Sequence, residues 1–160
     1  MSLKEDVNGA LAAMSAPNAP TKLALDDTGR CAIALPFPGD IVELDEGVLT
    51  VTVEVSPTSR FFTLSTPLAA VGRKTGGEFF KALLYRQFYA DQVSGASFAV
   101  GGDEDVLVAV NHWTLDAITN GQFAELFKLF VSACLDLIDE VGTMAQRERN
   151  VKPLHKGRTN

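Results

Sequence analysis

The sequence predicts an α+β fold, in which an antiparallel, twisted sheet is packed mainly on one face by three helices. Apolar and polar residues alternate in several short stretches, as in half-buried strands, and apolar residues recur every three or four positions in three others, as in amphipathic helices. Along the chain the order is helix, strands, helix, strand pair, helix. With 160 residues, 46% of them hydrophobic and 21% charged, the chain suits one domain with a sizeable core.

The first helix is predicted near the N-terminus. Ser2 and Glu5 have the spacing of a capping box, in which each side chain satisfies a backbone N–H at the helix start. Pro17 and Pro20 end the segment. Between these signals runs one apolar stripe, formed by Leu3, Val7, Ala10, Leu11 and Met14.

Strands are predicted over the next part of the chain. In "TKLALDDTGRCAIALPF" a turn at residues 26–29 separates two alternating stretches. The clearest strand is "GVLTVTVEV", with alternate leucine and valine residues on one face. It is followed by "RFFTLSTPL", in which Phe62 and Leu64 share a face and Phe61 lies on the other. A phenylalanine is unexpected there if that face is solvated.

The second helix is predicted over residues 77–93, "GEFFKALLYRQFYADQV", and has two apolar sides. Such a helix is expected to be buried twice, against its own sheet and against a partner. One side consists of Phe80, Leu83, Leu84 and Phe88, and the other of Phe79, Tyr85 and Tyr89.

Three consecutive acids, Asp103, Glu104 and Asp105, follow a glycine pair between two alternating stretches. A calcium loop needs ligands at alternating positions and a later bidentate glutamate, so these acids do not have metal-ligand spacing. We interpret them as a solvated hairpin turn between residues 98–100 and 106–110.

The last helix is predicted from Thr119, which has capping-box spacing to Gln122. Its expected core face consists of Phe123, Leu126, Phe127, Phe130, Val131, Cys134, Leu137, Ile138 and Val141.

Charge divides the chain into a domain at residues 1–146 and a basic tail at 147–160, expected to be disordered. The tail has a net charge of +4 and the whole chain −6, so residues 1–146 carry −10. An acidic body repels nucleic acid, and no apolar run is long enough for a membrane helix. The N-terminus makes a poor signal peptide, and Cys31 and Cys134 indicate no disulfide framework, so we expect a cytoplasmic protein.

Motifs for catalysis or for a cofactor are not evident. "VGRKTGG" lacks the spacing of a phosphate-binding loop, and no serine lies in a nucleophile elbow. Neither His112 nor His155 has a partner at metal-ligand spacing. We therefore predict no catalytic residue, no metal and no cofactor, and a protein that is not an enzyme.

A surplus of apolar residues indicates an interaction surface instead. The strand at residues 106–110, "VLVAV", is apolar on both faces, as is the second helix. We predict a homodimer whose interface includes Tyr85, Tyr89, Val106 and Val108. The alternative is a thicker core than this outline gives.

Residues 79–141 resemble the class I type III secretion chaperones, the Tir-chaperone or CesT-like family. The resemblance rests on paired leucines ending a helix, a small strand, an apolar strand, a leucine–aspartate step and a final amphipathic helix. These features are Leu83-Leu84, residues 95–98, residues 106–110, Leu115-Asp116 and Phe123 onward. Gln87 stands where the family commonly has asparagine.

The resemblance implies a cytoplasmic bacterial homodimer that binds the N-terminal region of a secreted effector and keeps it competent for export. We hypothesise that Val7, Leu11, Met14 and Phe61 help line the client groove. The alternative for Val7 and Leu11 is that they anchor the first helix to the sheet. Two other functions are an interaction domain of the same fold without a secreted client and, less favoured, a small ligand-binding or thioesterase-like enzyme.

Overall fold

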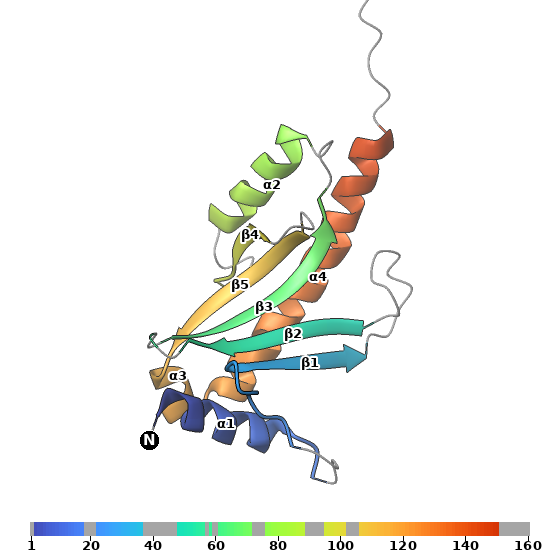
Figure 1. Cartoon of the computed structure of the whole chain (residues 1–160). Coiled ribbons are helices and arrows are strands. Elements are labelled where there is room, and N and C mark those ends of the chain that lie inside the picture. Colours follow the sequence, from blue (N-terminus) through green and yellow to red (C-terminus); the bar gives the residue numbers. More distant parts are fainter. Residues whose placement is uncertain are drawn as a thin grey trace, which may run out of the picture.

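The computed structural model describes residues 2–17, 22–36, 48–56, 58, 61–71, 76–88, 95–101 and 106–150, with side chains omitted at 142 and 145–150. The predicted α+β class and the order of its elements are confirmed, with one short extra helix before the last (Figure 1). The elements are α1 (Leu3–Met14), β1 (Arg30–Pro36), β2 (Val48–Val55), β3 (Phe61–Ala70), α2 (Gly77–Phe88), β4 (Ser97–Gly101), β5 (Val106–Thr114), α3 (Asp116–Thr119) and α4 (Phe123–Asn150).

The five strands form one antiparallel sheet in the order β1-β2-β3-β5-β4, so β1 and β4 are its edges. The pairing of β3 with β5 shifts between Pro67 and Ala69. The predicted hairpin of β4 and β5 is confirmed, whereas Asp103, Glu104 and Asp105 lie outside the described residues.

The two faces of the sheet differ in burial. The helix face carries buried leucine, valine and phenylalanine side chains, and α4 packs against it along β3. The opposite face, here called the open face, has no buried residue among those described. By the strand register, the open face comprises the even-numbered residues of β1, β2 and β5, the odd-numbered residues of β4, and Phe61, Thr63, Ser65 and Pro67 of β3.

Aromatic packing holds α4 on the helix face. The rings of Phe62 on β3 and Phe123 on α4 lie 5.4 Å apart between centroids, and Phe123 stacks on Phe127 at 6.3 Å. Seven of the nine residues predicted for this core face are buried, and Leu126 and Val131 are partly buried.

The helix starts agree only in part with the prediction. The capping box of α1 is confirmed, with the Ser2 amide donating to Glu5 Oε2 at 2.7 Å and the Glu5 amide to Ser2 Oγ at 3.4 Å. The capping box at Thr119 is wrong, because Thr119 belongs to α3 and its hydroxyl donates to the carbonyls of Leu115 and Asp116. Helix α4 begins only at Phe123.

Two further predictions need correction. Residues 22–25 form no strand, because the Leu23 amide donates to Oγ of Ser15, the C-cap of α1, and the Leu25 amide to Oδ1 of Asn8 within α1, both at 2.8 Å. Residues 147–150, predicted as the start of the tail, continue α4, which agrees with the strong helix propensity of "AQRER". The rest of the tail lies outside the described residues.

Candidate functional site

Helix α1 turns Val7 and Leu11 into the core. Both side chains are 0% exposed, so neither can contact a client in this structure. The hypothesis that they line a groove is therefore corrected. Because residues at i and i+4 lie on the same face of a helix, both side chains enter the core together and anchor α1 there. Met14 is only partly buried.

Met14 lines a groove between α1 and α4, which we call the α1–α4 groove. Its volume is about 450 Å³. Alanines make much of its wall, and one cation, Lys128, lies among the lining residues. The groove is lined by Ala10, Ala13, Met14, Ile118, Gly121, Phe123, Ala124 and Lys128.

Phe61 lies elsewhere. It begins β3 on the open face, opposite Thr114, and is 49% exposed. Because the α1–α4 groove is built from helices, Phe61 does not line it. The four residues predicted to bind a client are therefore divided among the core, the groove and the open face.

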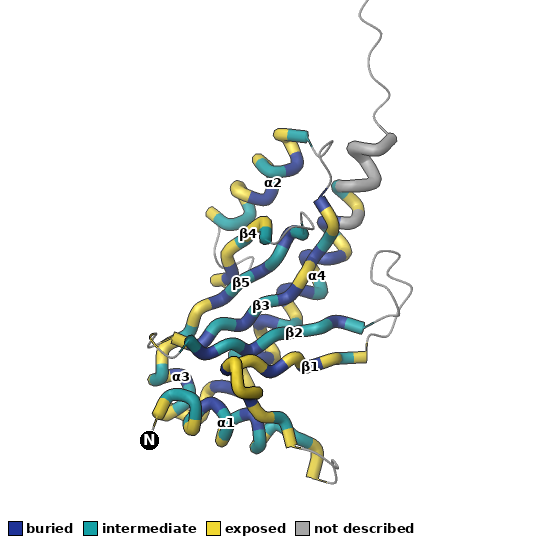
Figure 2. Tube along the Cα trace, viewed as in Figure 1, coloured by how far each residue is buried: buried dark blue, intermediate teal, exposed yellow. Residues whose placement is uncertain are grey.

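The free edge of β1 is a second candidate for binding, and Figure 2 shows exposed and buried residues alternating along this strand. The Val55 amide donates to the Gly29 carbonyl at 2.9 Å. Hydrogen-bonded and non-hydrogen-bonded pairs alternate in an antiparallel ladder, so Cys31 and Ile33 face β2 with their backbone groups. The amides and carbonyls of Ala32 and Ala34 therefore point away from the sheet.

The β1 edge is bounded at both ends. At one end, Asp26 binds both backbone groups of Arg30. At the other, Pro36 has no N–H to donate. Among the described residues, none pairs with the backbone of Ala32 or Ala34, so a segment of extended chain could add there.

The opposite edge of the sheet, β4, is in contact with helix α2. Gln87 of α2 accepts a hydrogen bond from the Phe98 amide of β4 through Oε1 at 3.2 Å. Sequence reasoning noted Gln87 only as a departure from a family pattern and did not predict this role. The contact makes β4 a less accessible edge than β1.

Helix α2 exposes large apolar side chains, as predicted, but its two sides are composed differently. Phe79 and Leu83 are the buried pair, whereas Leu84, Tyr85 and Phe88 are 66%, 63% and 80% exposed. Tyr85 also lines a hollow of about 550 Å³ between α2 and α4. Tyr89 lies outside the described residues.

The open face has a polar end and an apolar end. Across the polar end, Arg30 and Glu54 form an ion pair at 3.1 Å, and Thr63 Oγ1 lies 3.0 Å from His112 Nδ1. Val106, Val108 and Val110 line β5 toward the other end and are only partly buried. Two of the predicted interface residues, Val106 and Val108, therefore lie on an accessible apolar surface.

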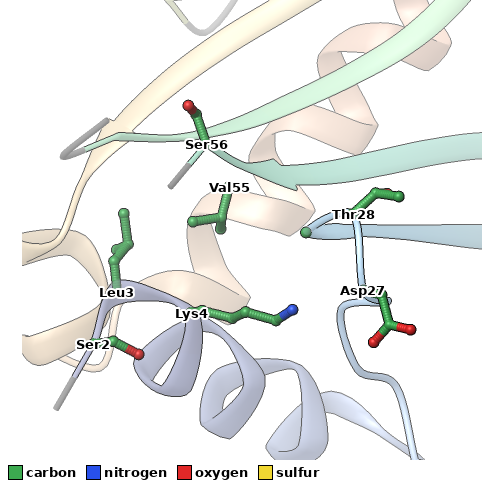
Figure 3. A pocket seen from close by; sticks show the side chains of 8 residues that line it. Ser2, Leu3, Lys4, Asp27, Thr28, Val55 and Ser56 are labelled. Atoms are coloured by element: carbon green, nitrogen blue, oxygen red, sulfur yellow. The ribbon is translucent and has the colours of Figure 1, made fainter. Parts of the chain in front are cut away.

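A smaller hollow of about 290 Å³ lies where α1 begins, beside the ends of β1 and β2. In Figure 3, Leu3 rises from α1 toward Val55, and Lys4 extends toward the turn of Asp27 and Thr28. Ser2 serves the capping box and Lys4 Nζ donates to the Asp26 carbonyl at 2.8 Å. The Lys4 hydrogen bond therefore fastens α1 to the turn before β1.

The cysteines are poorly suited to nucleophilic chemistry. Burial raises the pKa of Cys134 to about 12 and also raises the pKa of Cys31. Both thiols therefore stay protonated at neutral pH. Within the described part of the chain, no group of three or more His, Cys, Asp or Glu side chains could hold a metal ion, and no helix is long and apolar enough to span a membrane.

No protein-family model and no curated protein matches the sequence. Solved structures do. A chain in the crystal structure of the ExsC–ExsE complex is 15% identical, with a TM-score of 0.60 over 84% of this chain and 92% of that one. A chain in the structure of the HopA1–SchA chaperone–effector complex is 12% identical, with a TM-score of 0.53 over 82% of this chain and 94% of that one. At these identities the likeness is one of fold.

Proposed function

We propose that this protein is a cytoplasmic type III secretion chaperone that binds the N-terminal region of an effector and keeps it competent for export. The fold shared with a chain from a chaperone–effector complex supports the class of protein. The open edge of β1 is the observation in this chain that carries the proposal, because it offers backbone groups to an extended client.

Client binding at an edge strand requires no cofactor and no catalysis. An added strand forms main-chain hydrogen bonds with the sheet edge, and neighbouring pockets select alternate side chains. Ala32 and Ala34 are small and exposed, so they leave room for client side chains on the open face. The helix face next to the same strand is apolar through Cys31 and Ile33. An unfolded, partly apolar segment matches these features.

The proposed chaperone acts as a homodimer. The exposed apolar side of α2 and the valine end of the open face support an interface, since one protomer leaves them accessible to water. The predicted contacts are Tyr85, Tyr89, Val106 and Val108. A stable obligate interface of this kind commonly buries about 2,000 Å² or more.

Affinity capture from the native host tests this function. The tagged chain should co-purify with one secreted protein, and a version of that protein without its N-terminal region should not bind. Capture of a regulator or assembly factor that is never exported would instead favour an interaction domain of the same fold and reject the secretion role. Whole-cell fractionation of the tagged chain would test the cytoplasmic location.

A further inference from the structure

The α1–α4 groove combines an apolar lining with a cation, Lys128, that forms no ion pair among the described residues. We propose that it binds a client segment in which an apolar side chain is followed directly by an acidic residue, whose carboxylate pairs with Lys128. This inference rests on the proposed function and names the chemistry of the client that the groove selects.

The walls of the groove are preformed. On one side, the buried residues Val7 and Leu11 fix α1 in the core, which leaves Ala10 and Ala13 at the groove. On the other, Phe123 is 3% exposed and packs against Phe62. A client side chain therefore enters a site that needs little rearrangement, and preformed sites lose less ordering entropy on binding.

The lining selects an apolar side chain. Alanine methyl groups from both helices create the space, and the volume of about 450 Å³ falls in the usual range of ligand sites. The groove offers few polar side chains to a client, so a polar side chain there would lose its hydrogen bonds to water without full replacement.

Lys128 accounts for the acidic residue in the proposed client segment. It is exposed and follows Ala124 by four residues, which places it on the same side of α4. The ion pairs in the described residues involve Arg30 with Glu54, Lys81 with Glu78, and Arg86 with Glu140. Lys128 takes part in none of them, although Glu125 is on the same helix.

Charge favours an acidic client over the chain's own tail as the occupant. Residues 1–146 carry a net −10, and the exposed Lys128, which is in none of the described ion pairs, provides a local site for a carboxylate beside the groove. The tail at residues 147–160 carries +4 and would meet like charge at Lys128. Such complementarity contributes more to specificity than to affinity.

Peptide titration tests the groove without knowledge of the natural client. The probes are two capped peptides, Ser-Gly-Leu-Asp-Gly-Ser and Ser-Gly-Leu-Lys-Gly-Ser, added to the isotope-labelled full chain and followed by NMR. The aspartate peptide should shift the amides around Ala13 and Ala124 and bind about two- to five-fold more tightly than the lysine peptide. That preference should shrink at about 1 M salt, where the Debye length is about 3 Å.

Substitutions test whether the preference for the aspartate peptide arises at Lys128 and at the groove. Lys128→Glu should reverse the preference, whereas Lys81→Glu, an equal charge change on α2, should preserve it. Ala124→Trp fills the groove from an exposed position and should abolish binding of both peptides, and Ala13→Trp serves the same purpose if the first variant unfolds early. Urea unfolding of each variant checks that the fold is retained.

Several outcomes would overturn the proposal. These are no binding of either peptide, equal binding of both, a preference that survives Lys128→Glu, or groove shifts that depend on protein concentration and so reveal a second copy as the occupant. A captured client that binds Lys128→Glu and Ala124→Trp normally would reject the groove while the chaperone function stands. Failure to capture any secreted client would reject the function, and the peptide titration would still judge the groove.

Discussion

Asp26 and Arg30 close one end of the β1 edge by two reciprocal hydrogen bonds. The Asp26 amide donates to the Arg30 carbonyl at 2.7 Å, and the Arg30 amide donates to Asp26 Oδ1 at 3.0 Å. Both backbone groups of Arg30 that face away from β2 are thereby satisfied. The accessible edge begins only at Ala32, so this turn sets where an added strand can start.

The Asp26 turn should give the fold a measurable dependence on pH. Hydrogen bonds from the Thr28 hydroxyl, and next from the Arg30 amide, hold the pKa of Asp26 below its usual value of 3.8. A lowered pKa in the folded state stabilises the fold above the unfolded value, and this contribution is lost as pH falls through the folded pKa. Asp26→Ala should therefore be less stable than wild type at neutral pH.

Urea unfolding at neutral pH and again at about pH 2, below the lowered pKa of Asp26 in the folded state, would follow this difference. The deficit of Asp26→Ala should shrink on acidification, since the wild-type carboxylate is then protonated. Asp27→Ala, which removes an equal charge from the next position, serves as the control and should show a smaller deficit. A deficit for Asp26→Ala that is undiminished in acid would contradict the proposed hydrogen-bonding role.

The second prediction separates core from surface among the residues first assigned to the client. Leu11→Ala should lower the free energy of unfolding by about 2–5 kcal/mol, because Leu11 is fully buried and its truncation leaves a cavity. Phe61→Ser should cost about 1 kcal/mol or less, since Phe61 is 49% exposed. Urea unfolding would measure both variants. Similar losses in the two would mean that Phe61 is packed more closely than its exposure indicates.

The sequence indicated most of the fold because burial leaves a periodic pattern in it. The alternation of apolar and polar residues predicted β2 and β3, and the recurring phenylalanines of α4 indicated its core face. Residues 22–25 alternate like a strand yet are bound by Ser15 and Asn8, and no local pattern shows such a partner from another element. The place of Lys128 beside the α1–α4 groove and the contact of Gln87 with β4 likewise depend on which elements become neighbours in space.

The third prediction concerns self-association. Val108→Asp should weaken the proposed dimer by about ten-fold or more, because the substitution places an unpaired charge in its predicted apolar interface. Sedimentation at several protein concentrations would measure it, with wild type at twice the mass of one chain. Ala34→Asp adds the same charge to the open face at β1 and is the matched control. A wild-type chain that is a monomer at micromolar concentration, or a Val108→Asp dimer as tight as wild type, would reject this interface.

The last prediction tests the β1 edge as the place where a client strand adds. The amide of Ala32 points away from β2, so proline there removes no bond of the sheet ladder but takes away a donor from the free edge. Edge strands tolerate proline for this reason, and the fold of Ala32→Pro should survive. Ile33→Pro removes a ladder donor instead and should be the less stable variant.

Binding of the captured client to Ala32→Pro should fall about ten-fold, through the lost hydrogen bond and the bulk of the ring. Ala32→Ser keeps the amide and should bind like wild type. Isothermal titration with the client's N-terminal region would compare the variants, and normal binding by a folded Ala32→Pro would show that the client attaches elsewhere.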